Sequence, residues 1–287
     1  MMLGKTSPTR LMKDRVFARL CQLAAIAGVV ILVFLMFGLF KDGFTKLNWQ
    51  FVSSFPSRFA ARAGIKAALV GTLWIIIVTM VIAIPIGIAA GIYLEEVAKK
   101  SRLTRLIELN IANLAGVPSI IYGLLGLAMF VRWLSLGRSI LAGSLTMSLL
   151  ILPMVIITTQ EALRAVPRSI RDGSLALGAS NWQTIMRQTL PSALPGIMTG
   201  IILAISRAIG ETAPIVTIGA ITFVTYLPTG IRDTFTALPI QIFNWTSRPQ
   251  AAFHTAAAGA ICVLLILLFC LNLTAIIIRQ RARRRLG

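Results

Sequence analysis

Residues 67–94 read AALVGTLWIIIVTMVIAIPIGIAAGIYL and contain no charged side chain. A helix needs about 20 apolar residues to cross the hydrocarbon core of a bilayer, so this stretch is long enough to span it. Lipid offers no hydrogen-bonding partner to free backbone groups, and the alternation typical of a membrane barrel is missing here, so we expect a helix. The stretch therefore predicts a membrane protein.

Five further segments meet the same criterion: residues 20–40, 107–131, 139–159, 195–225 and 252–278. The first of them follows five basic residues and is longer than the apolar core of a cleaved signal peptide, which predicts an uncleaved span. Of the 287 residues, 57% are hydrophobic and 13% charged, whereas soluble domains are about 25% charged. The fold class predicted is an all-α polytopic membrane protein with six transmembrane helices.

The placement of lysine and arginine predicts the orientation of these spans. With the N-terminus inside, the cytoplasmic side collects 18 of the 28 basic residues, the outer side collects nine, and Arg207 lies within a span. Because positive charge concentrates on the cytoplasmic side, both termini are predicted to be cytoplasmic. Basic residues beside apolar spans suit anionic membrane lipids, so the net charge of +19 does not indicate a nucleic-acid partner.

Cysteine and histidine give no pattern typical of a metal centre. The three cysteines lie in apolar runs, and His254 is the only histidine, so we expect neither catalytic residues nor metal ligands nor a cofactor. Gly4-Lys5-Thr6 mimics the end of a P-loop, but the upstream glycine would precede Met1 and no strand comes before it. We therefore expect a chain that is not an enzyme and whose energy comes from a partner.

The span 195–225 contains an unusual charged pair, Arg207 and Glu211. Residues four apart share one helical face and lie about 6 Å apart along the axis. A lone charge at the bilayer centre costs about 2.5–3.5 kcal/mol, so the two side chains are expected to pair and to face protein or water. Both a structural salt bridge and the polar lining of an ion path fit the pair. The planar donors of Arg207 suit an oxyanion and favour the path.

Glycine pairs mark close helix packing in two spans. Gly87 and Gly91, and again Gly196 and Gly200, have the small-xxx-small spacing that lets helix backbones approach each other. We expect both pairs to lie at helix–helix contacts.

A long polar loop connects the fourth and fifth segments. Its central part, Asp172 to Pro191, reads DGSLALGASNWQTIMRQTLP. The preceding residues are helix-prone with a break at Pro167, residues 172–186 can form a short helix, and Gly178 allows a tight turn. Ordering so long a connection costs entropy, so we expect it to contact another protein.

This loop resembles the EAA loop of ABC importer permeases. That pattern is Glu-Ala-Ala, three residues, Gly, nine residues, Ile, one residue and Leu-Pro. The matching positions here are Asp172-Gly173-Ser174, Gly178, Gln188 and Leu190-Pro191, with the spacing kept throughout. Aspartate stands for glutamate, Gly173 and Ser174 replace the alanines, and Gln188 replaces the isoleucine.

Four strings outside the loop extend the resemblance over nearly the whole chain. They resemble the PstA-type permeases of the ABC phosphate importers, and the Glu-Thr-Ala-Pro ending favours that type over its PstC-type sister. The strings are Gly71–Trp74, Gly116–Gly123, Arg207–Pro214 and Leu238–Trp245.

The resemblance implies an architecture and partners. Residues 66–277 would form a type I ABC importer transmembrane domain, with its cytoplasmic coupling loop at 160–194. Residues 1–65 would hold an N-terminal basic arm, the first transmembrane helix and a periplasmic loop. Residues 278–287 would form a basic cytoplasmic tail. It implies a bacterial plasma (inner) membrane protein that pairs with a PstC-like permease, two PstB-like ATPase subunits and a periplasmic PstS-like phosphate-binding protein.

The resemblance also implies roles for particular residues. A short helix around residues 172–184 would be the coupling helix that docks into the ATPase. Arg207 and Glu211 would lie near the phosphate path. Coupling to the ATPase would involve Asp172, Gly173, Ser174, Gly178, Leu190 and Pro191.

Other functions fit parts of the pattern. The chain could serve another oxyanion importer, for phosphonate, molybdate or sulfate, or be the PstC-type sister subunit. A membrane-embedded enzyme would need a paired carboxylate, a metal cluster or a nucleophile with a base, and only Arg207 and Glu211 approach that. A stand-alone channel or secondary carrier would not need the long loop.

Overall fold

The computed structural model describes residues 8–220 and 223–284. Within these ranges the chain is helical, and its only strand-like pairing is an isolated bridge between Ser139 and Thr234. Five of the described helices are long and apolar enough to cross a membrane. They are α1 (Pro8–Phe44), α3 (Lys66–Ile92), α6 (Ile140–Arg164), α9 (Leu190–Gly210) and α12 (Ala251–Arg284).

Two of these helices continue beyond their α-helical bounds. A π-helical turn, η1 (Tyr93–Val97), extends α3. The short α8 (Asn181–Thr184) and the π-helical η3 (Ile185–Thr189) lead into α9, so that a single helix runs from Asn181 to Gly210. The π-helical turn η3 lies just before Pro191, which has no N–H to donate to the preceding turn.

The predicted third span, 107–131, is broken into two helical parts at Pro118. α4 (Arg102–Ala115) is followed by α5 (Ser119–Gly126) and the π-helical η2 (Leu127–Trp133), with a bend of 102° between the two halves. Pro118 causes the break, because it lacks an N–H and disfavours a helical conformation of the residue before it. The Tyr122 hydroxyl donates to the Leu114 carbonyl at 2.7 Å and braces the corner. Counted as one broken span, this bent pair raises the number of membrane-length segments in the described residues to six.

The predicted fifth span, 195–225, is too long. α9 ends at Gly210, and Glu211 adopts an extended conformation with φ −77° and ψ 119°. The short α10 (Ala213–Ile218) follows and ends at Gly219, whose φ is +82°. Glycine weakens a helix and proline begins a new one, which explains the break between Gly210 and Pro214. Residues 221–222 of this predicted span lie outside the described residues.

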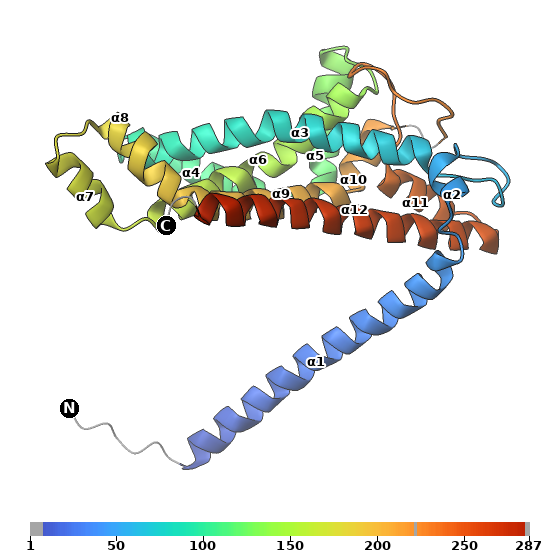
Figure 1. Ribbon diagram of the computed structural model, residues 1–287, viewed down its shortest axis with the longest axis horizontal. Coiled ribbons are helices and arrows are strands. Elements are labelled where there is room, and N and C mark those ends of the chain that lie inside the picture. Colours follow the sequence, from blue (N-terminus) through green and yellow to red (C-terminus); the bar gives the residue numbers. More distant parts are fainter. Residues whose placement is uncertain (1–7, 221–222, 285–287) are drawn as a thin grey trace.

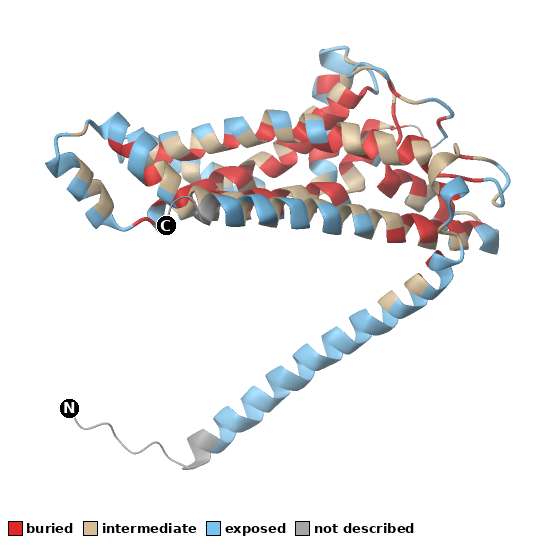
Figure 2. Cartoon of the chain, viewed as in Figure 1, coloured by how far each residue is buried: buried red, intermediate tan, exposed pale blue. Residues whose placement is uncertain are grey.

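α6 is the centre of the bundle, with α3 and α9 packed against it (Figure 1). Methyl groups added at Gly87 and Gly91 of α3 would collide with the side chains of Val155 and Thr159 on α6. The pair Gly196 and Gly200 of α9 approaches α6 in the same way. The predicted close packing of both glycine pairs is confirmed, and buried residues concentrate where these helices meet (Figure 2).

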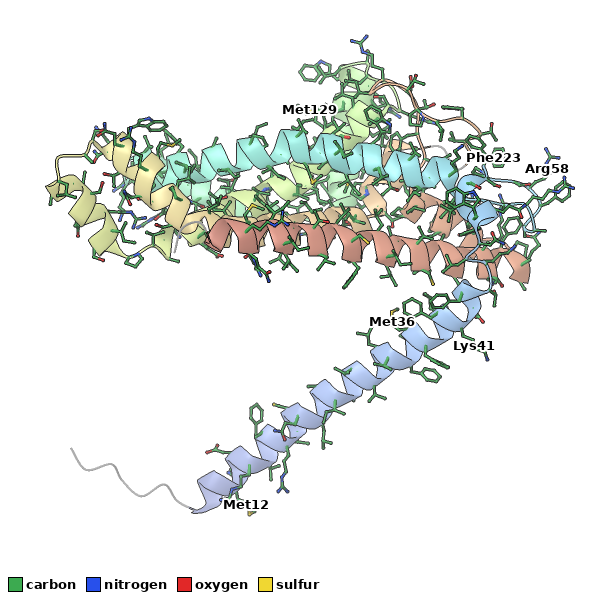
Figure 3. The ribbon with its side chains drawn as sticks, in the orientation of Figure 1. Met12, Met36, Lys41, Arg58, Met129 and Phe223 are labelled. Atoms are coloured by element: carbon green, nitrogen blue, oxygen red, sulfur yellow. The ribbon has the colours of Figure 1, made fainter. Side chains whose placement is uncertain are left out.

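α1 stands apart from the bundle along most of its length (Figure 1). Its apolar side chains are exposed, and Figure 3 shows Met12 projecting with no other element beside it. Contact with α12 occurs at the C-terminal end of α1, where Gly43 approaches Cys262 and the Ala258 carbonyl. So large an apolar surface must be covered by lipid or by another protein.

Loops and short helices close the two ends of the bundle. At one end α2 (Trp49–Ser53) and α11 (Leu238–Thr246) surround an aromatic cluster of Phe51, Trp245 and Phe253. At the other end α7 (Arg168–Ala176) and α8 project from the bundle. The N-terminal end of α1 and the C-terminal end of α12 lie on the side of α7 and α8 (Figure 1), in agreement with the predicted topology.

Candidate functional site

The predicted coupling helix over residues 172–184 is wrong as a single helix. α7 ends at Ala176, a turn follows, and α8 begins at Asn181. Gly178 lies in this turn with φ +85°, a left-handed conformation that is costly for other residues. The predicted break at Pro167 is confirmed, since Pro167 caps α7 with φ −56° and ψ 137°.

Local hydrogen bonds hold this helical hairpin together. The Ser174 hydroxyl bonds the Thr184 hydroxyl at 2.9 Å and links α7 to α8. Ser180 and Gln183 form a capping box at the start of α8, with bonds of 3.2 and 3.0 Å. Such reciprocal bonds satisfy helix-terminal N–H groups and fix the start of the helix.

The hairpin brings together four of the predicted coupling residues. Asp172, Gly173 and Ser174 lie on α7 and Gly178 lies in the turn. Leu190 and Pro191 are instead the first residues of α9, at the far end of η3 from the turn. They form part of the helix that enters the bundle rather than the tip of the loop.

The tip of the hairpin exposes apolar side chains that the sequence analysis did not single out. Leu177 is 90% exposed and Trp182 is 63% exposed. A cavity of about 460 Å³ is lined by Leu177 and by residues that include Gly173, Gln183 and Arg187. Exposed leucine and tryptophan side chains are typical of a protein-binding surface. The sequence signal for it was the position of Leu177 and Trp182 close to the turn residue Gly178.

The intramembrane pair occupies the break between α9 and α10. Arg207 lies in the last turn of α9, and its Nε lies 3.4 Å from Oε1 of Glu211. The two residues do not share a helical face as predicted, because α9 ends before Glu211. The pair forms nevertheless, since the extended backbone at Glu211 lets its side chain reach back. Arg207 at the C-terminal end of α9 is also favoured by the helix dipole.

Arg207 keeps most of its donors available. Its side chain is 37% exposed and that of Glu211 is 20% exposed. In the described part of the chain, the Arg207 side chain donates a hydrogen bond only to Glu211, and it does so through Nε. The terminal nitrogens can therefore bind an incoming oxyanion, which a planar guanidinium holds through two parallel hydrogen bonds.

Neighbouring helices position this break. Tyr122 of α5 interacts electrostatically with the charge of Arg207. Helix α5 also fits tightly on α10, because a methyl group at Gly123 would overlap Thr217 and Pro214. Ser206, next to Arg207, donates to Oδ1 of Asn272 on α12 at 2.7 Å. Tyr122 and Asn272 were missed as site residues; the only signal was a polar group in an apolar span.

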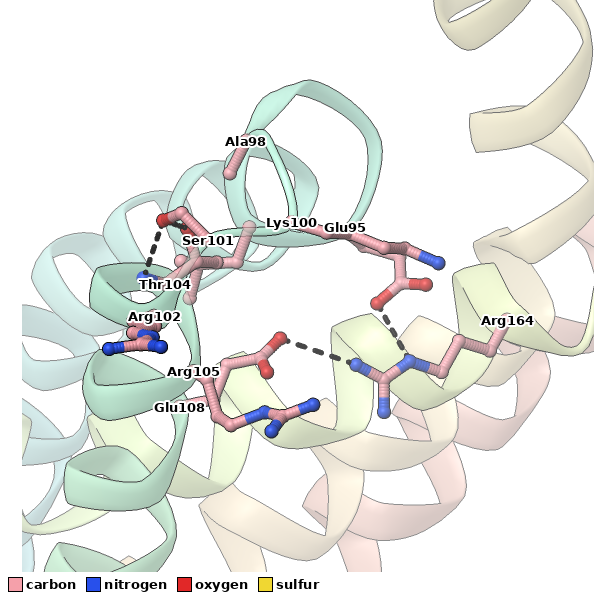
Figure 4. Close-up of a pocket in the computed structure, with 10 residues that line it drawn as sticks. Glu95, Ala98, Lys100, Ser101, Arg102, Thr104, Arg105, Glu108 and Arg164 are labelled. Carbon is pink, nitrogen blue, oxygen red and sulfur yellow. Dashed lines mark hydrogen bonds and ion pairs between the residues drawn. The ribbon is translucent and has the colours of Figure 1, made fainter.

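A second charged cluster lies at the cytoplasmic ends of the helices (Figure 4). Arg164 of α6 pairs with Glu95 of η1 at 2.7 Å and with Glu108 of α4 at 3.4 Å. Gln160 also donates to Glu108, at 3.1 Å. These contacts join α3, α4 and α6 around a cavity of about 480 Å³. Sequence reasoning missed them because they join residues more than 50 positions apart.

The opposite end of the bundle is closed by a loop before α11. Asp233 accepts hydrogen bonds from the Thr229 N–H, the Thr229 hydroxyl and the Gly230 N–H, at 2.7, 2.9 and 2.9 Å. These bonds stabilise the carboxylate and hold the pKa of Asp233 below its usual range. The carbonyls of Ile231 and Asp233 accept from the N–H groups of Leu141 and Ile140, and so cap α6.

Comparison with known proteins agrees with this architecture. A permease-like protein of Bacillus subtilis (strain 168), "Probable ABC transporter permease protein YqgI", is 32% identical over 280 residues, which cover 93% of this chain and 95% of that protein. "Phosphate transport system permease protein PstA 1" of Mycobacterium tuberculosis (strain ATCC 25618 / H37Rv) is 36% identical over 230 residues, covering 80% of this chain and 73% of that protein.

Solved structures share the fold at low sequence identity. A chain of the crystal structure of a bacterial ABC transporter that imports alginate aligns with a TM-score of 0.66 and 17% identity, over 95% of this chain and 98% of that chain. A family model described as "Binding-protein-dependent transport system inner membrane component" matches residues 83–285. The chain belongs to this family of inner-membrane components of binding-protein-dependent transport systems.

Proposed function

We propose that this chain is the membrane-spanning permease subunit of an ATP-driven importer of inorganic phosphate. The observation that carries the proposal is the 36% identity with a protein named as a PstA phosphate permease. The Arg207 guanidinium, with free donors at a helix break inside the bundle, supports an anionic substrate. The substrate would pass along a path lined by Arg207 and Glu211.

The proposed partners follow from the family and from the exposed surfaces. The α7–α8 hairpin would dock through Leu177 and Trp182 into an ATPase subunit, of which the complex would hold two PstB-like copies. A PstC-like sister permease and lipid would cover the apolar faces of α1 and α4, and a periplasmic PstS-like protein would deliver phosphate. The chain itself would bind no nucleotide and need no cofactor, so hydrolysis would occur in the partner.

One helix joins the proposed handle to the proposed gate. It runs without interruption from Asn181 in the hairpin to Gly210 beside the break. From Asn181 to Arg207 it covers about 39 Å at 1.5 Å per residue. When ATP binding moves the hairpin, this helix would carry the movement to the Arg207–Glu211 pair as a rigid lever.

At the gate, phosphate and Glu211 would compete for one guanidinium. A phosphate oxygen that bonds the terminal nitrogens of Arg207 weakens its attraction to Glu211, and release of the phosphate lets the ion pair form again. Glu211 thus keeps Arg207 neutralised while the path is empty, which lowers the cost of a charge inside the membrane.

Uptake by the complete transporter in vesicles tests the proposal. We expect ATP-dependent phosphate uptake, its loss with Arg207→Ala despite normal assembly, and partial activity with Arg207→Lys, which keeps the charge without the planar fork. Competition with phosphonate, molybdate and sulfate identifies the preferred anion. Normal uptake by Arg207→Ala would refute the pathway role, and a stronger effect of another oxyanion would refute the choice of phosphate.

A further inference from the structure

A partly buried ion pair connects the coupling hairpin to the end of α3. Arg171 lies on α7 next to Asp172, and its Nη2 donates to Oε1 of Glu96 in η1 at 2.6 Å. The two side chains are only 22% and 11% exposed. A short charge-assisted bond with little access to water is among the stronger contacts a protein makes.

Arg171 is held from two sides. Besides the carboxylate, it donates to the Leu163 carbonyl at 2.8 Å and to the Val166 carbonyl at 3.0 Å. These carbonyls belong to the corner between α6 and α7. The arginine would therefore stay attached to this corner even if Glu96 lost its charge.

The neighbouring carboxylate makes a parallel connection. Glu95 pairs with Arg164 at the end of α6, while Glu96 pairs with Arg171 on α7. The π-helical turn η1 thus directs two consecutive carboxylates to the two sides of the α6–α7 corner. The Arg164 side chain is 55% exposed, so the Glu96 pair is the better shielded of the two.

The backbone of α7 packs mainly on α8 and η3, which belong to the same hairpin. Its Ile170 also packs against an apolar cluster that includes Leu163 of α6 and Ala193 of α9. Without the Arg171–Glu96 pair, movement of α7 would therefore reach the membrane helices through α6 and α9. The pair adds a direct connection to α3.

We propose that Arg171 and Glu96 form a clasp that makes α3 follow the coupling hairpin, so that α3 and α9 move together when the ATPase moves α7. This inference rests on the proposed function. Arg171 and Glu96 are positioning residues that touch no substrate. With the clasp intact, α3 and α9, which flank α6, would move at the same time. Without it, ATP would be hydrolysed with less phosphate transported per ATP.

The test is the number of phosphate ions taken up per ATP hydrolysed by the complete transporter in vesicles. Glu96→Gln removes the charge at nearly constant shape and leaves Arg171 bound to the two carbonyls. Glu161→Gln is the matched control, because Glu161 is an exposed acid on α6 without an ion pair in the described part of the chain.

Loss of one charge-assisted hydrogen bond shifts the equilibrium between the joined and separated states of α3 and α7 by about tenfold or more. We therefore expect Glu96→Gln to lower the ratio by up to about tenfold. Glu96→Asp should lower it less and Glu96→Lys more, while Glu161→Gln keeps the wild-type ratio. The amount of assembled complex and the affinity for the ATPase should stay unchanged in all variants except Glu96→Lys.

Two results would overturn the clasp. One is a ratio for Glu96→Gln equal to that of Glu161→Gln. The other is a Glu96→Gln complex that fails to assemble, which would make the pair a structural contact only. If the wild type accumulates a different oxyanion, the substrate proposal fails while the clasp is tested by the same ratio for that anion.

Discussion

The two glycines of the coupling hairpin should respond in opposite directions to the same substitution. Gly178 has φ +85° in the turn between α7 and α8, whereas Gly173 lies within α7. A methyl group added at either position would meet no atom within 4 Å. Steric contact is therefore excluded, and only the backbone conformation distinguishes Gly178→Ala from Gly173→Ala.

The expected magnitudes follow from these conformations. A left-handed conformation costs an L-residue about 1–2 kcal/mol, which reduces the population of the native turn about 5–30-fold. Alanine in place of a helical glycine stabilises a helix by about 0.5–1 kcal/mol. Gly178→Ala should weaken docking of the ATPase by that 5–30-fold factor, and Gly173→Ala should preserve or strengthen it.

The assay is equilibrium binding of the purified ATPase to the permease pair in lipid nanodiscs. Gly178→Asn serves as the control, because asparagine tolerates the left-handed region better than other residues with a side chain. It should retain affinity much closer to that of the wild type. Equal weakening by Gly173→Ala and Gly178→Ala would refute the reasoning, since it would show that added volume matters and the turn conformation does not.

Three further predictions concern other parts of the bundle. Tyr122→Phe removes the hydroxyl that braces the α4–α5 corner and should cost about 1 kcal/mol, seen as a lower Tm; an unchanged Tm would contradict it. Gly200→Leu should destabilise the α6–α9 contact by about 1–3 kcal/mol, whereas Gly28→Leu on α1, where nothing lies within 4 Å, should not; equal Tm changes would refute the packing. The pKa of Asp233 is lowered in the folded protein. The stability that its carboxylate gives to the loop is therefore fully present above the ordinary aspartate pKa and is lost as the pH falls through the lower, folded pKa. Hydrogen exchange of residues 229–233 should thus stay slow from pH 7 to pH 5 and become fast at pH 7 in Asp233→Asn; fast exchange in the wild type at pH 5 would disprove this.

The membrane spans could be predicted because the hydropathy and the length of an apolar run are read directly from the sequence. Each predicted segment overlaps a membrane-length helix or, at 107–131, the bent pair. The size of the bend was not predicted, since the apolar pattern continues through Pro118 and does not reveal how far a proline deflects a span. The end of α9 was missed for the same reason, although Gly210 and Pro214 marked it.

The candidate site could be predicted only in part. Arg207 and Glu211 stand out because charge is rare in an apolar span, and Gly178 stands out by its place in the loop pattern. The split of the coupling helix was not predicted, because both halves have helical sequences and the turn depends on one glycine. The pair of Arg171 and Glu96 could not be predicted, since it joins residues 75 positions apart.

The central claim is that this chain forms the gate and receives its force from a separate ATPase through the α7–α8 hairpin. The most direct test is to reconstitute the permease pair in vesicles together with the phosphate-binding protein, with and without the ATPase, and to measure phosphate accumulation and ATP hydrolysis together. The account predicts uphill accumulation only when the ATPase and ATP are both present. Uphill accumulation or ATP hydrolysis by the permease pair alone would contradict it.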